Sequence, residues 1–395
     1  MKKLLLTSTA LVTLVAGSAF ADDLQVGAGG SALFEAGVRS QKTAYQTPHA
    51  TPNQKNTAFN SKAKLYVKAM NKADNGLVYG AVAGVRTSAV NDLGYNSSQT
   101  DRTYLFLEGG FGRVELGSNY SAGQVMKVDA GSVARASGGA TEGNWSDYVN
   151  TNGTGTNAYD SLYYMNSALL SENALRNSGA NEEARKISYF TPRVSGFQVA
   201  VSYTPDSSNH GDVSAKSSMN SASMPIRDFK DVVSGGVNFT NQYDQFTLSL
   251  SAIGETGKGI NVAGKDVSGM KHKLQSYSLG GSVSYANLAL AASYGTTNKK
   301  SVVYDLTTPA VNNRGVKYWT AGASYVQGPM GASLTYLHSD AQRNKLRNVS
   351  VGVDFAAAQG LKLYAEDSMF QLKSSTASVL KNKGNVFLVG SKLNF

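Results

Sequence analysis

The sequence predicts an all-β fold: a transmembrane antiparallel β-barrel of about sixteen strands, with short periplasmic turns and long extracellular loops. Three observations support this prediction. The chain begins with an export segment. Its last strand is apolar on one face and ends on an aromatic residue. Between them, short amphipathic runs are joined by connections that are alternately short and long.

The first residues form an export signal. They carry two lysines, an apolar run from Leu4 to Val15, and the sequence Ala-Phe-Ala at residues 19–21. This is the order of a basic region, an apolar core and a cleavage site, and the apolar run is too short to span a bilayer as a helix. We therefore expect a signal peptide at 1–21 and a barrel domain at 22–395, exported to the cell outer membrane.

The final segment alternates in the way that a membrane-facing strand requires. Side chains on a strand point to opposite faces in turn. One face of the segment carries Phe387, Val389, Leu393 and Phe395. The other face includes Lys392 and Asn394. An apolar face that ends in an aromatic residue favours a transmembrane strand, and the alternative is the terminal edge strand of a soluble sheet.

The same alternation recurs through the mature chain. Residues 61–70 place apolar side chains on one face and lysines on the other, and residues 77–85 return after an Asp-Asn-Gly turn at 74–76. Such a turn between two alternating runs is a strong hairpin signal. The long connections lie at about 39–60, 88–101, 119–184, 205–230, 256–273, 297–316, 339–346 and 372–383. A soluble β-sandwich has no reason to make every second connection long.

Composition argues against several other classes of protein. The chain has no cysteine, so disulfides, thiolate metal sites and thiol catalysis are excluded. It contains none of the G-x-S-x-G, H-E-x-x-H or P-loop motifs, and we expect no enzyme activity, cofactor or metal. The formal charge of +10 falls to +8 when Lys2 and Lys3 are removed. For an exported chain this charge suits a basic channel interior rather than nucleic-acid binding.

A barrel of about sixteen strands encloses an aqueous channel, whose selectivity depends on the charges at its narrowest point. The connection at 119–184 is the longest, and we predict that it folds inward as a constriction loop. Its candidate acidic residues are Asp129, Glu142 and Asp147. The candidate basic wall that faces them consists of Lys62, Lys64, Lys68, Arg86, Arg102 and Arg113. The alternative is that these cations are ordinary solvated charges of the lumen or rim.

Two segments and the last residue resemble the general porins of proteobacterial outer membranes. The segments are 105–117, which reads LFLEGGFGRVELG, and 185–197, which reads RKISYFTPRVSGF, and the last residue is Phe395. The resemblance implies a homotrimer of sixteen-stranded barrels that passes small hydrophilic solutes passively. It also implies that the terminal Phe is read by the barrel-assembly machinery and that outer-membrane lipids and lipopolysaccharide surround the barrel. The chain departs from many relatives at Ser118, where they carry Arg.

We therefore predict a passive diffusion channel for small hydrophilic solutes and ions, weakly selective with a preference for anions. Two alternatives remain open: a substrate-specific channel for sugars or phosphorylated solutes, and a structural or adhesive barrel. Small residues on one face of the first strand, Ala28, Gly30 and Ala32, suit close packing of barrels in a trimer. They suit a crowded closure of the barrel equally well.

Overall fold

A computed structural model of the chain describes residues 12–13, 24–42, 45, 56–87, 99–150, 184–207, 229–259, 273–298, 315–341, 344–375 and 379–395. The expected signal peptide lies outside the described residues, apart from the two-residue strand β1 (Val12–Thr13). This short strand pairs with Ala28 and Gly27.

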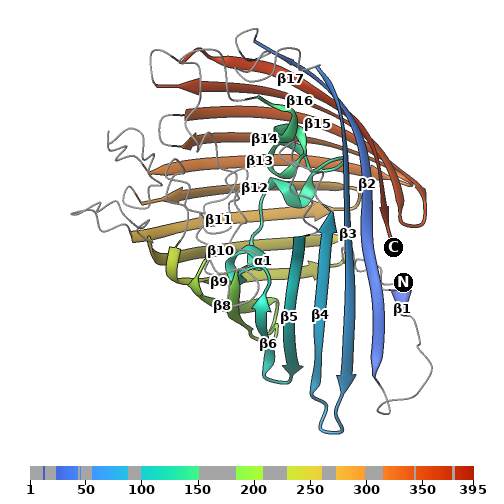
Figure 1. Cartoon of the computed structure of the whole chain (residues 1–395), viewed down its shortest axis with the longest axis vertical. Coiled ribbons are helices and arrows are strands. Elements are labelled where there is room, and N and C mark those ends of the chain that lie inside the picture. The colour runs from blue at the N-terminus through green and yellow to red at the C-terminus, as the bar shows by residue number, and fades with distance from the viewer. Residues whose placement is uncertain are drawn as a thin grey trace.

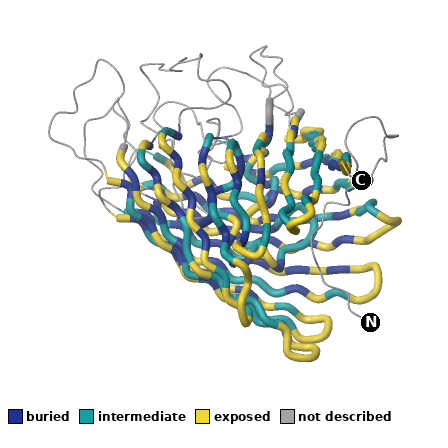
Figure 2. The backbone as a smooth tube through the Cα atoms, turned by 90° about the horizontal axis from the view of Figure 1, so that it is seen from below, coloured by how far each residue is buried: buried dark blue, intermediate teal, exposed yellow. Residues whose placement is uncertain are grey.

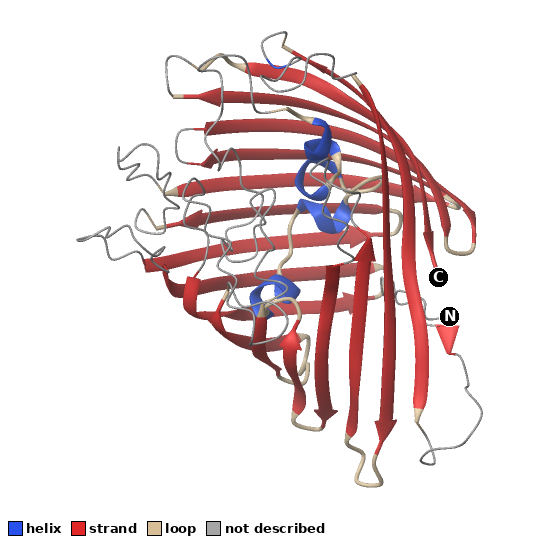
Figure 3. Cartoon of the chain, in the orientation of Figure 1, coloured by secondary structure: helices blue, strands red, loops and turns tan. Residues whose placement is uncertain are grey.

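The described chain forms one closed antiparallel barrel (Figures 1 and 3). Its strands are β2 (Gln25–Gln41), β3 (Thr57–Lys72), β4 (Val78–Thr87), β5 (Gln99–Gly109), β6 (Gly112–Ser118), β7 (Arg185–Phe190), β8 (Phe197–Asp206), β9 (Phe229–Tyr243), β10 (Phe246–Gly259), β11 (Lys273–Tyr285), β12 (Leu288–Thr297), β13 (Val316–Gln327), β14 (Met330–Ala341), β15 (Asn344–Ala358), β16 (Leu361–Ser374) and β17 (Asn382–Asn394). Each strand pairs with the next in sequence, and β17 pairs with β2. The predicted sixteen-stranded antiparallel barrel is confirmed.

The last residue takes part in closing the barrel. The backbone N–H of Gly30 donates to the carbonyl of Phe395 at 2.7 Å, and the N–H of Phe395 donates to the carbonyl of Gly30 at 3.1 Å. A Cβ built on Gly30 would lie 3.1 Å from the Phe395 ring, so the ring covers this glycine. Of the two interpretations of the small residues in β2, Gly30 therefore serves the closure of the barrel.

The short connections are tight hairpins whose residues explain their geometry. In the first, Gly76 adopts a φ of +84°, and the Asn75 side chain accepts the N–H of Leu77 at 3.1 Å. Positive φ carries no steric penalty for glycine, and Asn stabilises such turns with its own side chain. One long connection was predicted wrongly. β14 continues to Ala341 and β15 begins at Asn344, so most of the predicted connection at 339–346 is strand. Its polar residues continue the ladder rather than form a loop.

The two faces of the sheet differ in character, and Figure 2 shows buried and exposed residues alternating along the strands. Large apolar side chains are exposed on the outward face, among them Leu65, Val67, Leu105, Val199, Leu279, Leu334, Val351, Val353, Phe387 and Val389. The inward face is rich in Ser, Thr, Asn and acidic residues. An apolar outer band around a polar interior is the arrangement of a transmembrane β-barrel. Among the described residues, no helix is long and apolar enough to cross a bilayer.

Residues 119–150 fold into the barrel. This segment contains α1 (Ala122–Met126), η2 (Ala130–Val133), α2 (Gly139–Glu142) and α3 (Trp145–Tyr148). The helices lie on the concave side of the sheet (Figure 3). In order, they contact β7–β10, β11–β14, β14–β16, and then β17 with β2. The helices therefore cover the inner surface from β7 round to β2 and leave most of β3 to β6 uncovered.

An apolar cluster holds the end of this segment to the wall. Trp145, Tyr148 and Val149 are buried against side chains of β13–β17. The wall contributes Tyr318, Leu337, Leu346, Phe370, Leu372, Val386 and Leu388. The Trp145 ring stacks on Phe370 with 6.0 Å between ring centroids. The barrel thus has an interior core, and that core exists only because the segment docks there.

Candidate functional site: the barrel lumen

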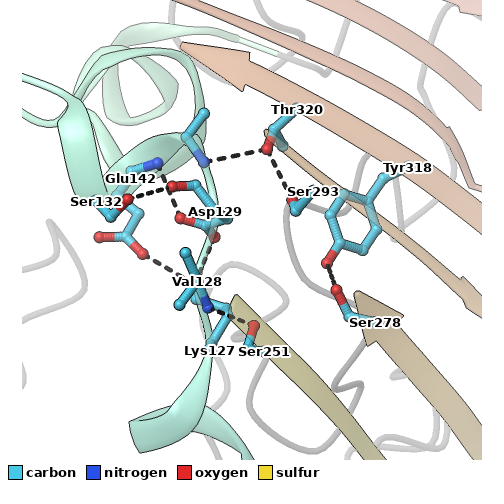
Figure 4. Close-up of polar contacts among 12 residues, drawn as sticks. Lys127, Val128, Asp129, Ser132, Glu142, Ser251, Ser278, Ser293, Tyr318 and Thr320 are labelled. Atoms are coloured by element: carbon cyan, nitrogen blue, oxygen red, sulfur yellow. Dashed lines mark hydrogen bonds and ion pairs between the residues drawn. The ribbon is translucent and has the colours of Figure 1, made fainter. Parts of the chain in front are cut away.

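Inward hydroxyl groups of the wall accept the backbone N–H groups of the segment 119–150. The N–H of Val128 donates to Ser251 Oγ at 3.0 Å, and that of Ala130 donates to Thr320 Oγ1 at 3.2 Å. Thr320 in turn contacts Ser293 Oγ at 2.7 Å (Figure 4). A buried N–H without a partner is costly, so these hydroxyl groups fix the path of a segment that lacks its own ladder.

Two buried carboxylates of the wall anchor the second half of the segment. Glu366 accepts hydrogen bonds from the Ser137 hydroxyl at 2.8 Å and from the Gly139 N–H at 3.0 Å. Glu35 accepts from Asn144 Nδ2 at 3.1 Å and from Tyr148 Oη at 3.0 Å. Both carboxylates were missed in the sequence. The sequence feature that could have revealed them is an acidic residue at an inward position of a strand. A carboxylate is costly to bury unless hydrogen-bond donors surround it, so such a position indicates a docking partner.

At two positions the wall can approach the segment closely only because it carries glycine. A Cβ on Gly280 would lie 1.7 Å from the Val128 carbonyl oxygen, and a Cβ on Gly37 would lie 2.2 Å from the Tyr148 ring. Neither gap admits a methyl group. These glycines in β11 and β2 are therefore part of the docking surface.

The two ends of the connection are tied together at its base. The buried Lys186 ammonium donates to the carbonyl of Ala184 at 2.7 Å and also to that of Asn119. Asn119 Nδ2 donates to the buried Glu115 carboxylate at 2.6 Å. Residues 151–183 of the predicted loop lie outside the described residues.

The wall that the segment leaves uncovered is basic. Strand β3 carries three of the predicted cations, Lys62, Lys64 and Lys68. Together with Tyr66 they lie on the inward face, whereas the exposed Leu65 and Val67 lie on the outward face. Strand register places Arg86 directly beside Lys64. Arg102 follows on β5 and Arg113 on β6, so the six predicted cations lie on four adjacent strands.

A β-bulge places an acidic residue among these cations. Gly84 pairs with Arg102 and Val85 with Thr100, which leaves Asp101 as an extra residue in β5. A bulge of this kind redirects a side chain. The buried Asp101 carboxylate lies 3.1 Å from Lys64 Nζ, 3.6 Å from an Arg86 nitrogen and 3.8 Å from Arg102 Nε. It also accepts a hydrogen bond from the Tyr66 hydroxyl. Alternation alone does not reveal this residue, because the bulge shifts the pattern.

The other wall cations have different partners. Lys62 Nζ lies 2.8 Å from Asp147 and 3.1 Å from Asn144 Oδ1, and so it connects the wall to the segment. Arg113 pairs with Glu108 at 2.8 Å and with Glu115 at 2.7 Å. Lys68 and Arg113 both lie over the Phe106 ring, at 5.2 and 4.4 Å from its centroid.

The three predicted acidic residues of the segment have three different environments. Asp147 pairs with Lys62, as described above. Asp129 is buried, caps η2 through the N–H of Gly131, and lies 3.0 Å from Lys127 Nζ. Glu142 is half exposed and lies 2.9 Å from the same ammonium (Figure 4). Lys127, which the sequence analysis missed, lowers the pKa of Glu142 below the usual carboxyl range. The two carboxylates in turn raise the pKa of Lys127 despite its burial.

The comparisons with known proteins agree with this architecture. A family model described as Gram-negative porin matches residues 7–374. An uncharacterized protein of Rickettsia bellii is 31% identical over 457 aligned positions, and one of Rickettsia felis is 28% identical over 450, both covering each chain completely. Two mutants of Rhodopseudomonas blastica porin superpose with TM-scores of 0.57 and 0.54 at 13% identity, covering 94% of this chain and 100% of theirs.

These solved structures support the fold, and the family model supports the assignment. Within the described ranges, no group of three acidic or histidine side chains is placed to hold a metal ion. The family consists of channels rather than enzymes, and its barrels lie in the outer membrane. The chain belongs to the Gram-negative porin family and is an outer-membrane channel protein.

Proposed function

We propose that this channel passes small hydrophilic solutes and ions by passive diffusion, with a weak preference for anions. One observation carries the proposal: Lys64, Arg86 and Arg102 surround the single carboxylate of Asp101 on the wall that the inner segment leaves uncovered. Among the described residues, these three cations surround one carboxylate. The Asp101 side chain is buried beneath them, so the lumen meets the cations first.

The preference is weak because nearby acidic groups offset part of the positive charge. Asp147 neutralises Lys62, and Glu108 and Glu115 surround Arg113. Glu142 reaches the lumen but is paired with Lys127. The local field therefore favours anions without excluding cations.

A salt gradient across a planar bilayer tests the preference. The triple variant Lys62→Glu, Lys64→Glu and Lys68→Glu should move the reversal potential toward cations. Its matched control carries Lys230→Glu, Lys258→Glu and Lys273→Glu, the same change in charge at exposed positions on the outward face of β9–β11. Equal shifts in both variants, or a wild-type channel that already prefers cations, would contradict the proposal.

A substrate-specific channel is the second candidate, and one contact favours it. The Arg102 guanidinium lies 3.8 Å from the Tyr120 ring centroid and 5.7 Å from that of Tyr66. A guanidinium that contacts aromatic rings suits a planar or phosphorylated anion. This candidate predicts that such a solute reduces the ion conductance of the channel in a saturable way, and that the variant Tyr120→Ala relieves this reduction. Both results together would favour a substrate-specific channel over free diffusion.

We further propose that three barrels associate through the outward face of β2–β4. Alternation places Ala32, Ala63, Ala81 and Ala83 on that face, and small residues allow close approach. Residues 1–21 serve as the export signal, and Phe395 is the assembly signal for the barrel-assembly machinery. Native electrophoresis of the refolded protein, comparing wild type with Ala81→Trp, tests the trimer, because a large ring there should favour the monomer.

A further inference from the structure

Four exposed cations gather on the outward face of the barrel, at the long-loop ends of three adjacent strands. They are Lys345 and Arg347 of β15, Lys373 of β16 and Lys383 of β17, and they are called here the basic patch. Their outward direction follows from alternation. Leu346 and Leu372, each next to a member of the patch, are fully buried on the inner side.

Strand register brings these like charges together. Lys345 pairs directly with Lys373, while Arg347 and Lys383 both pair with Gln371. Like charges at directly opposed positions of a sheet destabilise it. Asp340 lies 3.4 Å from Lys345 and offsets one of the four charges. Within the described ranges, the other three members have no ion pair. An anion bound from outside the chain would therefore offset the repulsion between these like charges.

The aromatic residues beside the patch place it at the surface of the bilayer. Register runs in one row from Tyr294 through Trp319 and His338 to Arg347. Aromatic side chains of membrane barrels concentrate at the level of the lipid headgroups. On β15 the row is followed by outward Val349, Val351 and Val353, where acyl chains would lie.

The neighbouring strands β2–β5, which begin where β17 pairs with β2, lack such charges. On the outward faces of β2–β5, the described residues include no lysine or arginine; Phe34, Phe59, Leu65 and Leu105 are typical of that surface. Because β2–β4 are the strands proposed above for contact between barrels, the patch on β15–β17 lies beside that surface and outside it.

We propose that the basic patch binds the phosphate groups of anionic lipid headgroups in the leaflet at the long-loop side. This inference rests on the chain being an outer-membrane barrel, and it assigns a site to the lipid partner that the resemblance implies. A lysine can reach a headgroup phosphate while its aliphatic stem lies along the apolar surface of the barrel. Lys345 and Lys373 lie on neighbouring strands, so both can contact one phosphate and bind it more strongly than either lysine alone.

The experiment measures lipid binding to the refolded protein by native mass spectrometry in detergent. The probes are bisphosphoryl lipid A, phosphatidylglycerol and the zwitterionic phosphatidylcholine. The patch variant carries Lys345→Gln, Lys373→Gln and Lys383→Gln. The control carries Lys62→Gln, Lys64→Gln and Lys68→Gln, an equal loss of charge inside the lumen. Since one lysine near an anionic surface contributes roughly fivefold to affinity, the patch variant should bind anionic lipid roughly a hundredfold more weakly.

Each outcome has a meaning. If the wild type binds lipid A but not phosphatidylglycerol, and the patch variant does not bind lipid A, the inference is supported and the ligand is the glycolipid. Loss of both anionic lipids supports it for the shared phosphate. Wild-type binding by the patch variant, an equal loss in the control, or equal binding of phosphatidylcholine overturns it. Single-channel conductance of the patch variant should match wild type, so a failure here is distinguishable from a failure of the proposed channel function.

Discussion

Replacing Glu35 by glutamine should release the end of the inner segment from the barrel wall. Glu35 is fully buried on β2 and accepts three hydrogen bonds. Two come from the segment, from Asn144 at 3.1 Å and Tyr148 at 3.0 Å, and the third comes from Tyr364 of β16 at 2.8 Å. Glutamine has nearly the same shape, but it turns one acceptor oxygen into a donor. In one orientation the amide nitrogen faces Asn144 Nδ2, and that hydrogen bond is lost. In the other it faces Tyr148, whose hydroxyl must then accept instead of donate. In both orientations the bonds to a charged acceptor become bonds to a neutral one.

The size of the effect follows from these bonds. A hydrogen bond to a charged group contributes about 1.5–3 kcal/mol, and an unpaired buried donor adds a further cost. Removing the buried charge offsets part of the loss, because that charge had to be desolvated. We therefore expect docking to weaken by about 2–3 kcal/mol, which is about a 30- to 150-fold change in the docked-to-released ratio.

Tryptophan fluorescence reports this change directly. The chain has two tryptophans. Trp145 is buried at the start of α3, whereas Trp319 is exposed on the outward face. In a Trp319→Phe background, Trp145 is the only emitter. Glu35→Gln should shift its emission to the red and increase its quenching by acrylamide in detergent micelles. It should also increase the current noise of single channels.

A matched pair of hydroxyl deletions separates docking from general loosening. Tyr148→Phe removes a bond from the segment, and Tyr364→Phe removes a bond within the wall, to the same carboxylate. Only the first should expose Trp145. If quenching stays at the wild-type value in both Glu35→Gln and Tyr148→Phe, Glu35 does not hold the segment, and the reasoning above fails.

Three further predictions concern the wall, the segment and the interior core. Asp101→Asn should remove one negative charge from the wall and move the reversal potential toward anions, and a shift toward cations would contradict its assigned role. Lys127 lowers the pKa of Glu142, so the stabilisation from this pair is present above the unfolded-state pKa of Glu142 and is lost as pH falls through its lowered folded-state pKa. The variant Lys127→Met removes this effect. A pH titration of its ion selectivity should therefore show Glu142 protonating at a higher pH than in wild type. Leu388→Ala opens a cavity beneath the Trp145 cluster and should cost about 2–5 kcal/mol in urea unfolding, whereas Val389→Ala, which faces outward, should cost less.

The barrel was predictable because its signal repeats many times. Each strand alternates weakly, but tight turns such as 74–76 fix the register of each hairpin, and a one-residue slip would turn lysines such as Lys64 toward lipid. The connection at 342–343 was not predictable in this way. The polar residues near it resemble a loop, although the ladder simply continues through them.

The contacts that anchor the inner segment, residues 119–150, could not be predicted from local sequence patterns. Its anchors join residues far apart in the chain: Ser137 reaches Glu366, and Tyr148 reaches Glu35. No local pattern encodes such pairs. Asp101 was missed for a different reason, since a bulge breaks the period on which the assignment of faces depends. An acidic residue at an inward strand position is the clue that Glu35 and Glu366 share.

The distribution of charge changes what the net charge means. The formal charge of +10 suggested a basic lumen, yet Lys230, Lys258, Lys273 and the basic patch all lie on the outward face. Those charges face headgroups or solvent outside the barrel, and at physiological ionic strength charges more than about 8 Å apart across water are largely screened. Ion preference must therefore come from the cations within a few ångströms of the permeation path. Because Asp147, Glu108 and Glu115 pair with Lys62 and Arg113, the proposed anion preference rests mainly on the cations around Asp101.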